Sequence, residues 1–170
     1  MPVFFLVVAT TTGVLLPAER SVSLSAVLPV ERQALWDVMT DVENIAEWNV
    51  IVDDSFLMEP VDGKRVWRET DPGGGAISFR EVEADPPARW ATEVFDVEAP
   101  YAAEWVYTLT EEDGGTRLTI AETSVIPNPF LRFLMRFIVG NDRFQRAYIE
   151  SLAEHFGDES VRIELAPLES

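Results

Sequence analysis

The chain has 170 residues, 47% of them hydrophobic and 25% charged, which is typical of one folded domain and excludes wholesale disorder. Thirteen lysines and arginines against thirty acidic residues give a formal net charge of −17, which argues against a nucleic-acid partner because phosphates would be repelled. The lack of cysteine excludes disulfides and thiolate metal sites, and a single histidine excludes a histidine-cluster site. We therefore expect neither a metal nor a cofactor.

Residues 1–18 carry no charged side chain and are mostly apolar, so we treat them as a segment distinct from the domain. A helix over residues 2–18 would reach about 25 Å, short of the roughly 30 Å hydrocarbon core of a bilayer. Three interpretations stay open: a membrane anchor through residues 3–16, a helix packed on the domain, or a misassigned start. The chain is accordingly expected in the cytoplasm, either free or tethered to a membrane by this segment.

The next part of the chain predicts one strand, two short helices and a series of strands. Residues 21–28 alternate between apolar and polar side chains, Pro29 begins a helical stretch, and a second short turn contains Ile45 and Trp48. Alternation between turn residues predicts further strands at 50–58, 65–70, 76–84, 89–97, 101–110 and 116–126. Because the connections are short, we expect an antiparallel meander.

The last element is predicted as one long helix over residues 129–155. Asn128 and Pro129 fit its N-cap and its first position, and an apolar stripe follows at helical spacing. Gly140 interrupts this pattern, at a cost of about 1 kcal/mol relative to alanine. The interruption indicates a kink or a close approach of another backbone.

These elements divide the chain into three predicted parts. The apolar segment 1–18 comes first, a ligand-binding domain follows over residues 19–157, and an acidic tail occupies residues 158–170. The tail is expected either to fray or to add a short edge strand through residues 161–165.

Several motifs spread over residues 20–157 match one known pattern. They are Leu28-Pro29-Val30-Glu31, Leu35-Trp36, Met39-Thr40-Asp41, Trp48, Val66-Trp67-Arg68-Glu69, residues 82–89, residues 114–120 and Asn128-Pro129-Phe130-Leu131-Arg132-Phe133. In these motifs the chain resembles the SRPBCC (START-like) superfamily, in its polyketide cyclase/dehydrase and lipid transport branch. The resemblance implies an α+β helix-grip fold, in which a curved antiparallel sheet of about seven strands wraps around a long C-terminal helix, with two short helices after the first strand. Members include carriers of hydrophobic ligands, cyclases and proteins with no assigned function.

Such a fold would leave an apolar cavity between sheet and helix, suited to a lipid or a polyketide-like molecule. The candidate lining residues of this cavity lie either at inward positions of the strands or on the apolar stripe of the helix. For each of them, the alternative is that it only packs in the hydrophobic core. They are Trp105, Tyr107, Leu118 and Ile120 from the strands and Phe133, Phe137 and Phe144 from the helix.

Glu122 is the most informative polar residue, because alternation places it on the same face as Leu118 and Ile120. There it would orient a ligand or act as an acid or base. The alternative is a place near the rim, where it is solvated or paired with an arginine such as Arg68.

The sequence therefore predicts a protein that binds a hydrophobic small molecule. One alternative is a cyclase or dehydratase with Glu122 and Tyr107 as its acid/base pair, and another is a regulatory or interaction protein whose cavity is filled by side chains. No established catalytic motif occurs, and His155, at the predicted helix end, is expected to have a capping or surface role.

Overall fold

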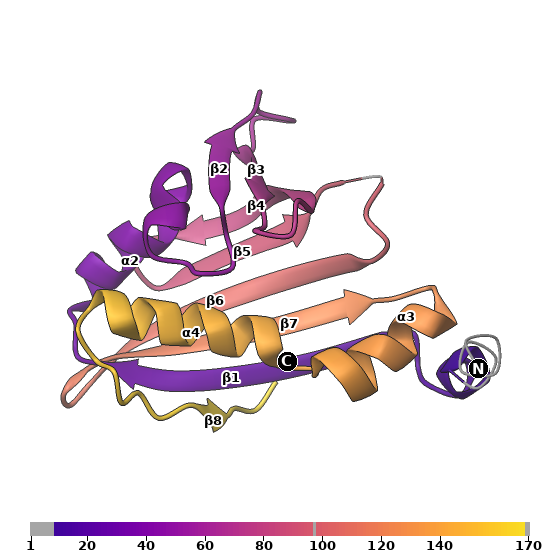
Figure 1. Cartoon of the computed structure of the whole chain (residues 1–170). Coiled ribbons are helices and arrows are strands. Elements are labelled where there is room, and N and C mark those ends of the chain that lie inside the picture. The colour runs from indigo at the N-terminus through magenta and orange to yellow at the C-terminus, as the bar shows by residue number, and fades with distance from the viewer. Residues whose placement is uncertain (1–8, 97, 169–170) are drawn as a thin grey trace.

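The alternating segments form an eight-stranded antiparallel sheet in the computed structural model, which describes residues 9–96 and 98–168 (Figure 1). The strands are β1 (Glu19–Leu28), β2 (Asp54–Leu57), β3 (Val66–Thr70), β4 (Ala76–Asp85), β5 (Arg89–Val94), β6 (Ala102–Glu112), β7 (Gly115–Val125) and β8 (Glu164–Leu165). Their order is β2-β3-β4-β5-β6-β7-β1-β8, so β2 to β7 form the predicted meander and β1 returns beside β7. The short β8 pairs with β1, which makes part of the tail an edge strand.

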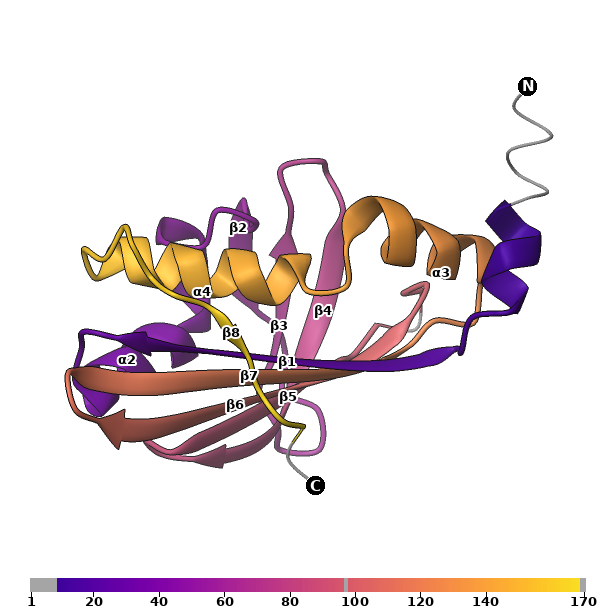
Figure 2. The ribbon, with the colours of Figure 1, turned by 90° about the horizontal axis from the view of Figure 1, so that it is seen from below.

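The helical elements lie in two groups. The first comprises α2 (Arg32–Thr40) and the 3-10 helix η1 (Val42–Glu47), and the second comprises α3 (Pro129–Leu134), the π-helix η2 (Met135–Val139) and α4 (Arg143–His155). Figure 2 shows α3 and α4 on the same side of the sheet, with α4 lying along β1 and β7. This arrangement confirms the helix-grip fold, with eight strands instead of about seven.

The long helix predicted over residues 129–155 is interrupted. Asn128 caps α3 as expected, since its Oδ1 accepts hydrogen bonds from the backbone N–H groups of Phe130 at 2.9 Å and Leu131 at 3.2 Å. The helix then widens into η2 and ends at Gly140, whose φ of 95° is a conformation that residues with a side chain rarely adopt. The predicted long helix is therefore broken at Gly140, the position at which the sequence indicated a kink, and the apolar stripe is divided between two segments.

The hydrophobic core lies between the concave face of the sheet, α4 and the α2–η1 region. At its centre Trp67, Trp90, Tyr107, Tyr148 and Trp48 form an aromatic row, with successive ring centroids 5.7, 5.1, 5.4 and 5.0 Å apart. Aromatic pairs of this kind contribute about 0.5–1.5 kcal/mol each beyond the area that they bury. The aromatic row thus ties β3, β5 and β6 to α4 and to the end of η1.

Residues 9–14 are helical, and the turn after them lies against α3. A Cβ atom on Gly13 would come within 1.8 Å of the Pro129 carbonyl oxygen, and Arg132 Nη1 donates to the Leu16 carbonyl oxygen at 2.6 Å. The described part of the apolar segment therefore packs on the domain, while residues 1–8 of the predicted anchor lie outside the described residues. None of the helices in 9–96 and 98–168 is long and apolar enough to span a bilayer.

Candidate functional site

Three glutamates project from the strands onto the concave face of the sheet. Glu122 of β7 contacts α4 through Gln145, and Glu81 of β4 accepts a hydrogen bond from Trp90 of the aromatic row at 3.0 Å. Glu69 follows Trp67 by two residues on β3, so alternation places both side chains on the same face. The partners of these three carboxyl groups distinguish their roles.

Glu122 is held on both oxygens and is only 3% exposed. Arg20 Nη2 donates to its Oε1 at 2.9 Å, and Gln145 Nε2 donates to its Oε2. Arg20 also donates to Ser124 Oγ at 3.0 Å and to the Asn141 carbonyl oxygen at 2.7 Å. This buried ion pair therefore joins β1 and β7 to the backbone just before α4.

The predicted alternative for Glu122 named the wrong partner. Arg68 neighbours the inward Trp67, so alternation sends its side chain to the other face of β3. There it donates to Ser78 Oγ at 2.9 Å and forms an ion pair with Asp96 at 3.3 Å. Glu122 lies inside the fold, as the interpretation of an inward-pointing side chain required, and not at the rim.

Glu81 is neutralised in the same way at the α2 end of the concave face. Arg65 Nη2 lies 2.7 Å from Glu81 Oε2, and Arg65 Nη1 donates to the Thr40 carbonyl oxygen at 2.8 Å. The Arg65 guanidinium also lies 5.9 Å from the ring centroids of Trp67 and Trp90. These contacts give Glu81 and Arg65 a structural role between α2 and the sheet.

Glu69 has no such cation. Trp67 Nε1 donates to its Oε1 at 2.8 Å, and no lysine or arginine of the described chain forms an ion pair with it. The side chain is half-buried, and burial raises the pKa of Glu69 to about 7. Glu69 is therefore a carboxyl group that exchanges its proton near neutral pH, on the face of the sheet that α4 covers.

Four apolar side chains of β4, β5 and β6 point inward, as Glu69 does, yet remain half-buried. They form what we call the open stretch: Ile77 and Phe79 of β4, Val94 of β5 and Trp105 of β6. Their direction follows from the register, because Ile77 is opposite Glu69, Phe79 is opposite Trp67, and Val94 is opposite Phe79. Trp105 stacks on Tyr107 with centroids 6.4 Å apart. The open stretch offers apolar surface that the fold itself leaves uncovered.

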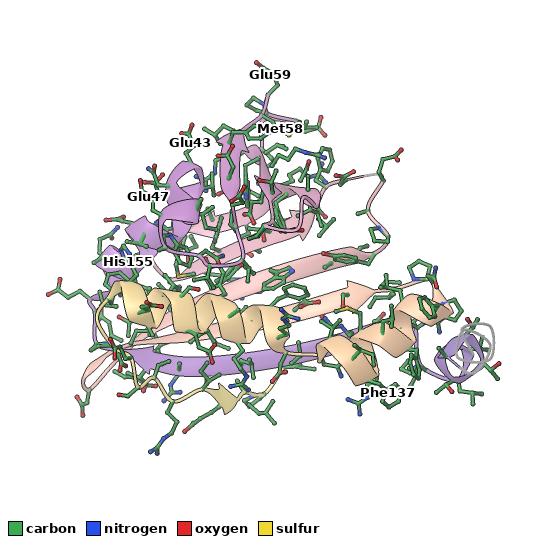
Figure 3. All side chains as sticks on the ribbon, in the orientation of Figure 1. Glu43, Glu47, Met58, Glu59, Phe137 and His155 are labelled. Atoms are coloured by element: carbon green, nitrogen blue, oxygen red, sulfur yellow. The ribbon has the colours of Figure 1, made fainter. Side chains whose placement is uncertain are left out.

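The predicted ligand-binding residues fall into three separate groups. Trp105 is half-buried on the concave face, whereas Tyr107, Leu118, Ile120 and Glu122 point to the same face but are buried there. The three phenylalanines lie on the helical segments: Phe133 is half-buried and 5.1 Å from Phe137, and Phe137 and Phe144 are exposed. Figure 3 shows Phe137 on the segment between α3 and α4, at the opposite end of the helical region from His155. The break at Gly140 separates Phe133 and Phe137 from α4, whereas Phe144 lies on α4 itself with an exposed side chain.

Two buried polar atoms on α4 lack a hydrogen-bond partner within the described structure. They are Gln145 Oε1, on a side chain that is 0% exposed, and the hydroxyl group of Tyr148 in the aromatic row. Leaving a buried polar atom unpaired costs about 1–3 kcal/mol, so such atoms favour a bound water or a polar ligand group. Both atoms belong to the side of α4 that packs on the sheet.

Surface hollows occur elsewhere in the structure. Two of them lie beside the β6–β7 hairpin, one lined by Glu111, Glu112 and Asp113 and the other by residues 29–33, 111–112 and 114–116. Neither contains a predicted ligand-binding residue. No cluster of three or more histidine, aspartate or glutamate side chains suited to a metal ion occurs in residues 9–96 and 98–168. The concave face, which carries Glu69 and the open stretch, is the candidate site.

The family model described as "Polyketide cyclase / dehydrase and lipid transport" matches residues 19–157. No curated protein sequence matches the chain.

Solved structures share this fold at low sequence identity. The di-domain aromatase/cyclase StfQ from the steffimycin biosynthetic pathway is 12% identical with a TM-score of 0.66, and the match covers 84% of this chain and 52% of StfQ. The Zhui aromatase/cyclase from Streptomyces sp. R1128 is 15% identical with a TM-score of 0.66, and the match covers 81% of this chain and 93% of that one. A Mesorhizobium loti protein is 18% identical with a TM-score of 0.62, over 83% of this chain and 98% of its own. This chain thus spans about half the length of StfQ.

Replacing Glu69 with glutamine should remove a pH-dependent cost of folding. The pKa of Glu69 is about 7 in the folded chain against an ordinary value of 4.5, so the folded state binds more protons than the unfolded state between these values. The favourable contribution of Glu69 to stability is therefore fully present below pH 4.5, and it is lost as the pH rises from 4.5 to about 7. Relative to the wild type, we expect E69Q to gain about 2–3 kcal/mol between about pH 5 and about pH 8 in urea unfolding.

Glu104→Gln is the matched control, because Glu104 is an exposed glutamate next to Trp105 on β6. Its stability difference from the wild type should stay nearly constant over the same pH range. A constant difference for E69Q as well would contradict the raised pKa of Glu69.

The Arg20–Glu122 ion pair should show strong coupling in a double-mutant cycle. Arg20→Met leaves a buried carboxylate unpaired and Glu122→Gln leaves a guanidinium unpaired, so we expect each to cost about 2–4 kcal/mol in the free energy of unfolding. The double variant should lose at least about 1 kcal/mol less than the sum of the two, measured by urea unfolding at one pH. Additive losses would mean that Arg20 and Glu122 do not stabilise each other across β1 and β7.

Proposed function

Because the chain belongs to the polyketide cyclase/dehydrase and lipid transport family, we propose that it binds a hydrophobic small molecule, a lipid or a polyketide-like compound, between the concave face and α4. The observation that carries this proposal is the open stretch, whose four apolar side chains face inward and stay half-buried. A ligand that covers them gains about 25 cal/mol per Å² of apolar surface. In this proposal residues 19–157 form the binding domain, and residues 1–18 and 158–170 flank it.

Trp105 is the main contact residue in this proposal. Its ring stacks on Tyr107, which continues the aromatic row, and its half-buried position leaves part of the ring accessible. A flat ring system placed against Trp105 would extend this series of stacked rings. The geometry thus favours ring-bearing molecules over flexible chains.

The unpartnered atoms on α4 favour a ligand that also carries oxygen. The Tyr148 hydroxyl group can donate a hydrogen bond, and Gln145 Oε1 can accept one. A carbonyl oxygen of the ligand would accept from the Tyr148 hydroxyl group, and a hydroxyl group of the ligand, or a water held by it, would donate to Gln145 Oε1. A pure hydrocarbon would leave both of them unsatisfied.

A cyclase or dehydratase activity is the second candidate, and one observation favours it. The pKa of Glu69, raised by burial to about 7, suits a general acid or base at neutral pH. The pair suggested by the sequence fits less well, because both oxygens of Glu122 are bound and burial raises the pKa of Tyr107, which keeps its proton. We therefore place an acid–base role, in this second candidate, on Glu69.

Native mass spectrometry of the full chain, offered fatty acids, isoprenoids and aromatic polyketides in turn, tests the proposed binding. We expect a one-to-one adduct with a ring-bearing member of this panel. Calorimetry should then show that Trp105→Ala weakens binding at least about tenfold, because it removes the largest accessible aromatic contact.

Phe56→Ala is the matched control, since Phe56 is 45% exposed and is opposite Arg68, whose side chain lies on the other face of β3. Its affinity should equal that of the wild type. A chain that stays empty with the whole panel would overturn the binding function and favour the interaction protein.

A further inference from the structure

The concave face offers a ligand no unengaged cation within the described residues. Arg20 is bound to Glu122, Ser124 and Asn141, and Arg65 is bound to Glu81 and Thr40. Each of these two arginines forms an ion pair with one inward glutamate, which neutralises its charge. Glu69 is then the one ionisable inward group whose charge state is left to the ligand and the solvent.

This distribution of charge disfavours anionic ligands. The carboxylate of a fatty acid on the open stretch would lie near Glu69 with no arginine to balance it. The net charge of −17 adds to this repulsion at long range. Uncharged molecules carry neither penalty.

Trp67 fixes how the carboxyl group of Glu69 is presented. The indole is stacked between Phe79 at 5.6 Å and Trp90 at 5.7 Å, and its N–H donates to Glu69 Oε1. Oε1 is thereby held as an acceptor, so in the neutral acid the proton resides on Oε2. A neutral carboxyl group held in this way is a single hydrogen-bond donor beside the open stretch.

Resting on the proposed function, we propose that Glu69 recognises an uncharged, ring-bearing ligand by donating a hydrogen bond from its neutral carboxyl group to a ketone or hydroxyl oxygen. The ligand's rings then lie on the open stretch. The site selects against the corresponding carboxylates, because an anion would meet no free cation there.

Burial supports this role, since it raises the pKa of Glu69 to about 7 and keeps the neutral acid populated below that pH. Other charged or titratable groups face the same region from the neighbouring elements. They are Arg65 just before β3 with Glu81 of β4, Tyr101 before β6, Tyr107 of β6, Glu122 of β7 with Arg20 of β1, and Tyr148 of α4. The glutamates are ion-paired, and burial raises the pKa of all three tyrosines, which leaves Glu69 as the group that titrates near neutral pH.

Two naphthalene probes test the proposal, the neutral ketone 2-acetylnaphthalene and the matched anion 2-naphthoate. Calorimetry with the full chain should show that the ketone binds up to about 30-fold more weakly at about pH 8.5 than at about pH 5.5, as a pKa of about 7 requires when only the neutral acid binds. Naphthoate should bind more weakly than the ketone throughout. Glu69→Gln keeps a donor and loses the proton equilibrium, so its affinity for the ketone should stay within about twofold over this range.

Glu104→Gln, the exposed control on β6, should follow the wild-type pH profile. A flat wild-type profile, an E69Q profile that follows the wild type, or tighter binding of naphthoate would each overturn the proposal. Failure to bind the ketone, while the chain retains a hydrophobic adduct in mass spectrometry, would overturn this proposal alone. Failure with both probes and with the whole panel would overturn the proposed function itself.

Discussion

The register between β6, β7 and β1 is the constraint on which the site depends. Val22 and Trp105 are the partners of Glu122 on its two sides, and Arg20 is opposite Ser124, which places Arg20, Glu122 and Trp105 on the face that α4 covers. A shift of this register by one residue would turn Glu122 to the opposite face and leave Arg20 without its ion-pair partner. The same register lets Arg20 reach Asn141, so it also determines where α4 begins against the sheet.

Charge balance distinguishes Glu69 from the other two inward glutamates. Two of the three inward glutamates form an ion pair with an arginine, and that of Glu122 joins residues 102 positions apart in the chain. Glu69 forms no such ion pair, and above neutral pH the burial of its carboxylate lowers the stability of the folded chain. A group that costs stability and lies beside uncovered apolar surface is typical of a binding or catalytic site. In the proposed function, recognition therefore falls to Glu69, whereas Glu81 and Glu122 hold elements of the fold together.

Local sequence patterns predicted most of the fold and only part of the site. Alternation was sufficient to place the strands and the inward direction of Glu122 and Trp105, because strand periodicity is a local property. The partner of Glu122 was not predictable in this way, since Arg20 lies 102 positions away and its approach depends on β1 returning beside β7. Glu69 was missed for the same reason: its inward direction follows from Trp67, but its lack of an arginine is a property of the assembled sheet.

The protonation state of Glu69 can be measured most directly from the NMR signal of the Trp67 indole N–H, because this group donates a hydrogen bond to the Glu69 carboxyl group. In a pH titration followed by ¹H–¹⁵N correlation spectra, this signal should shift with a midpoint at about 7, the pKa of Glu69, and the shift should be absent in E69Q. The other four tryptophans serve as internal references. A midpoint near the ordinary value of 4.5 would show that Glu69 is a solvated surface acid, and would contradict the account of this site.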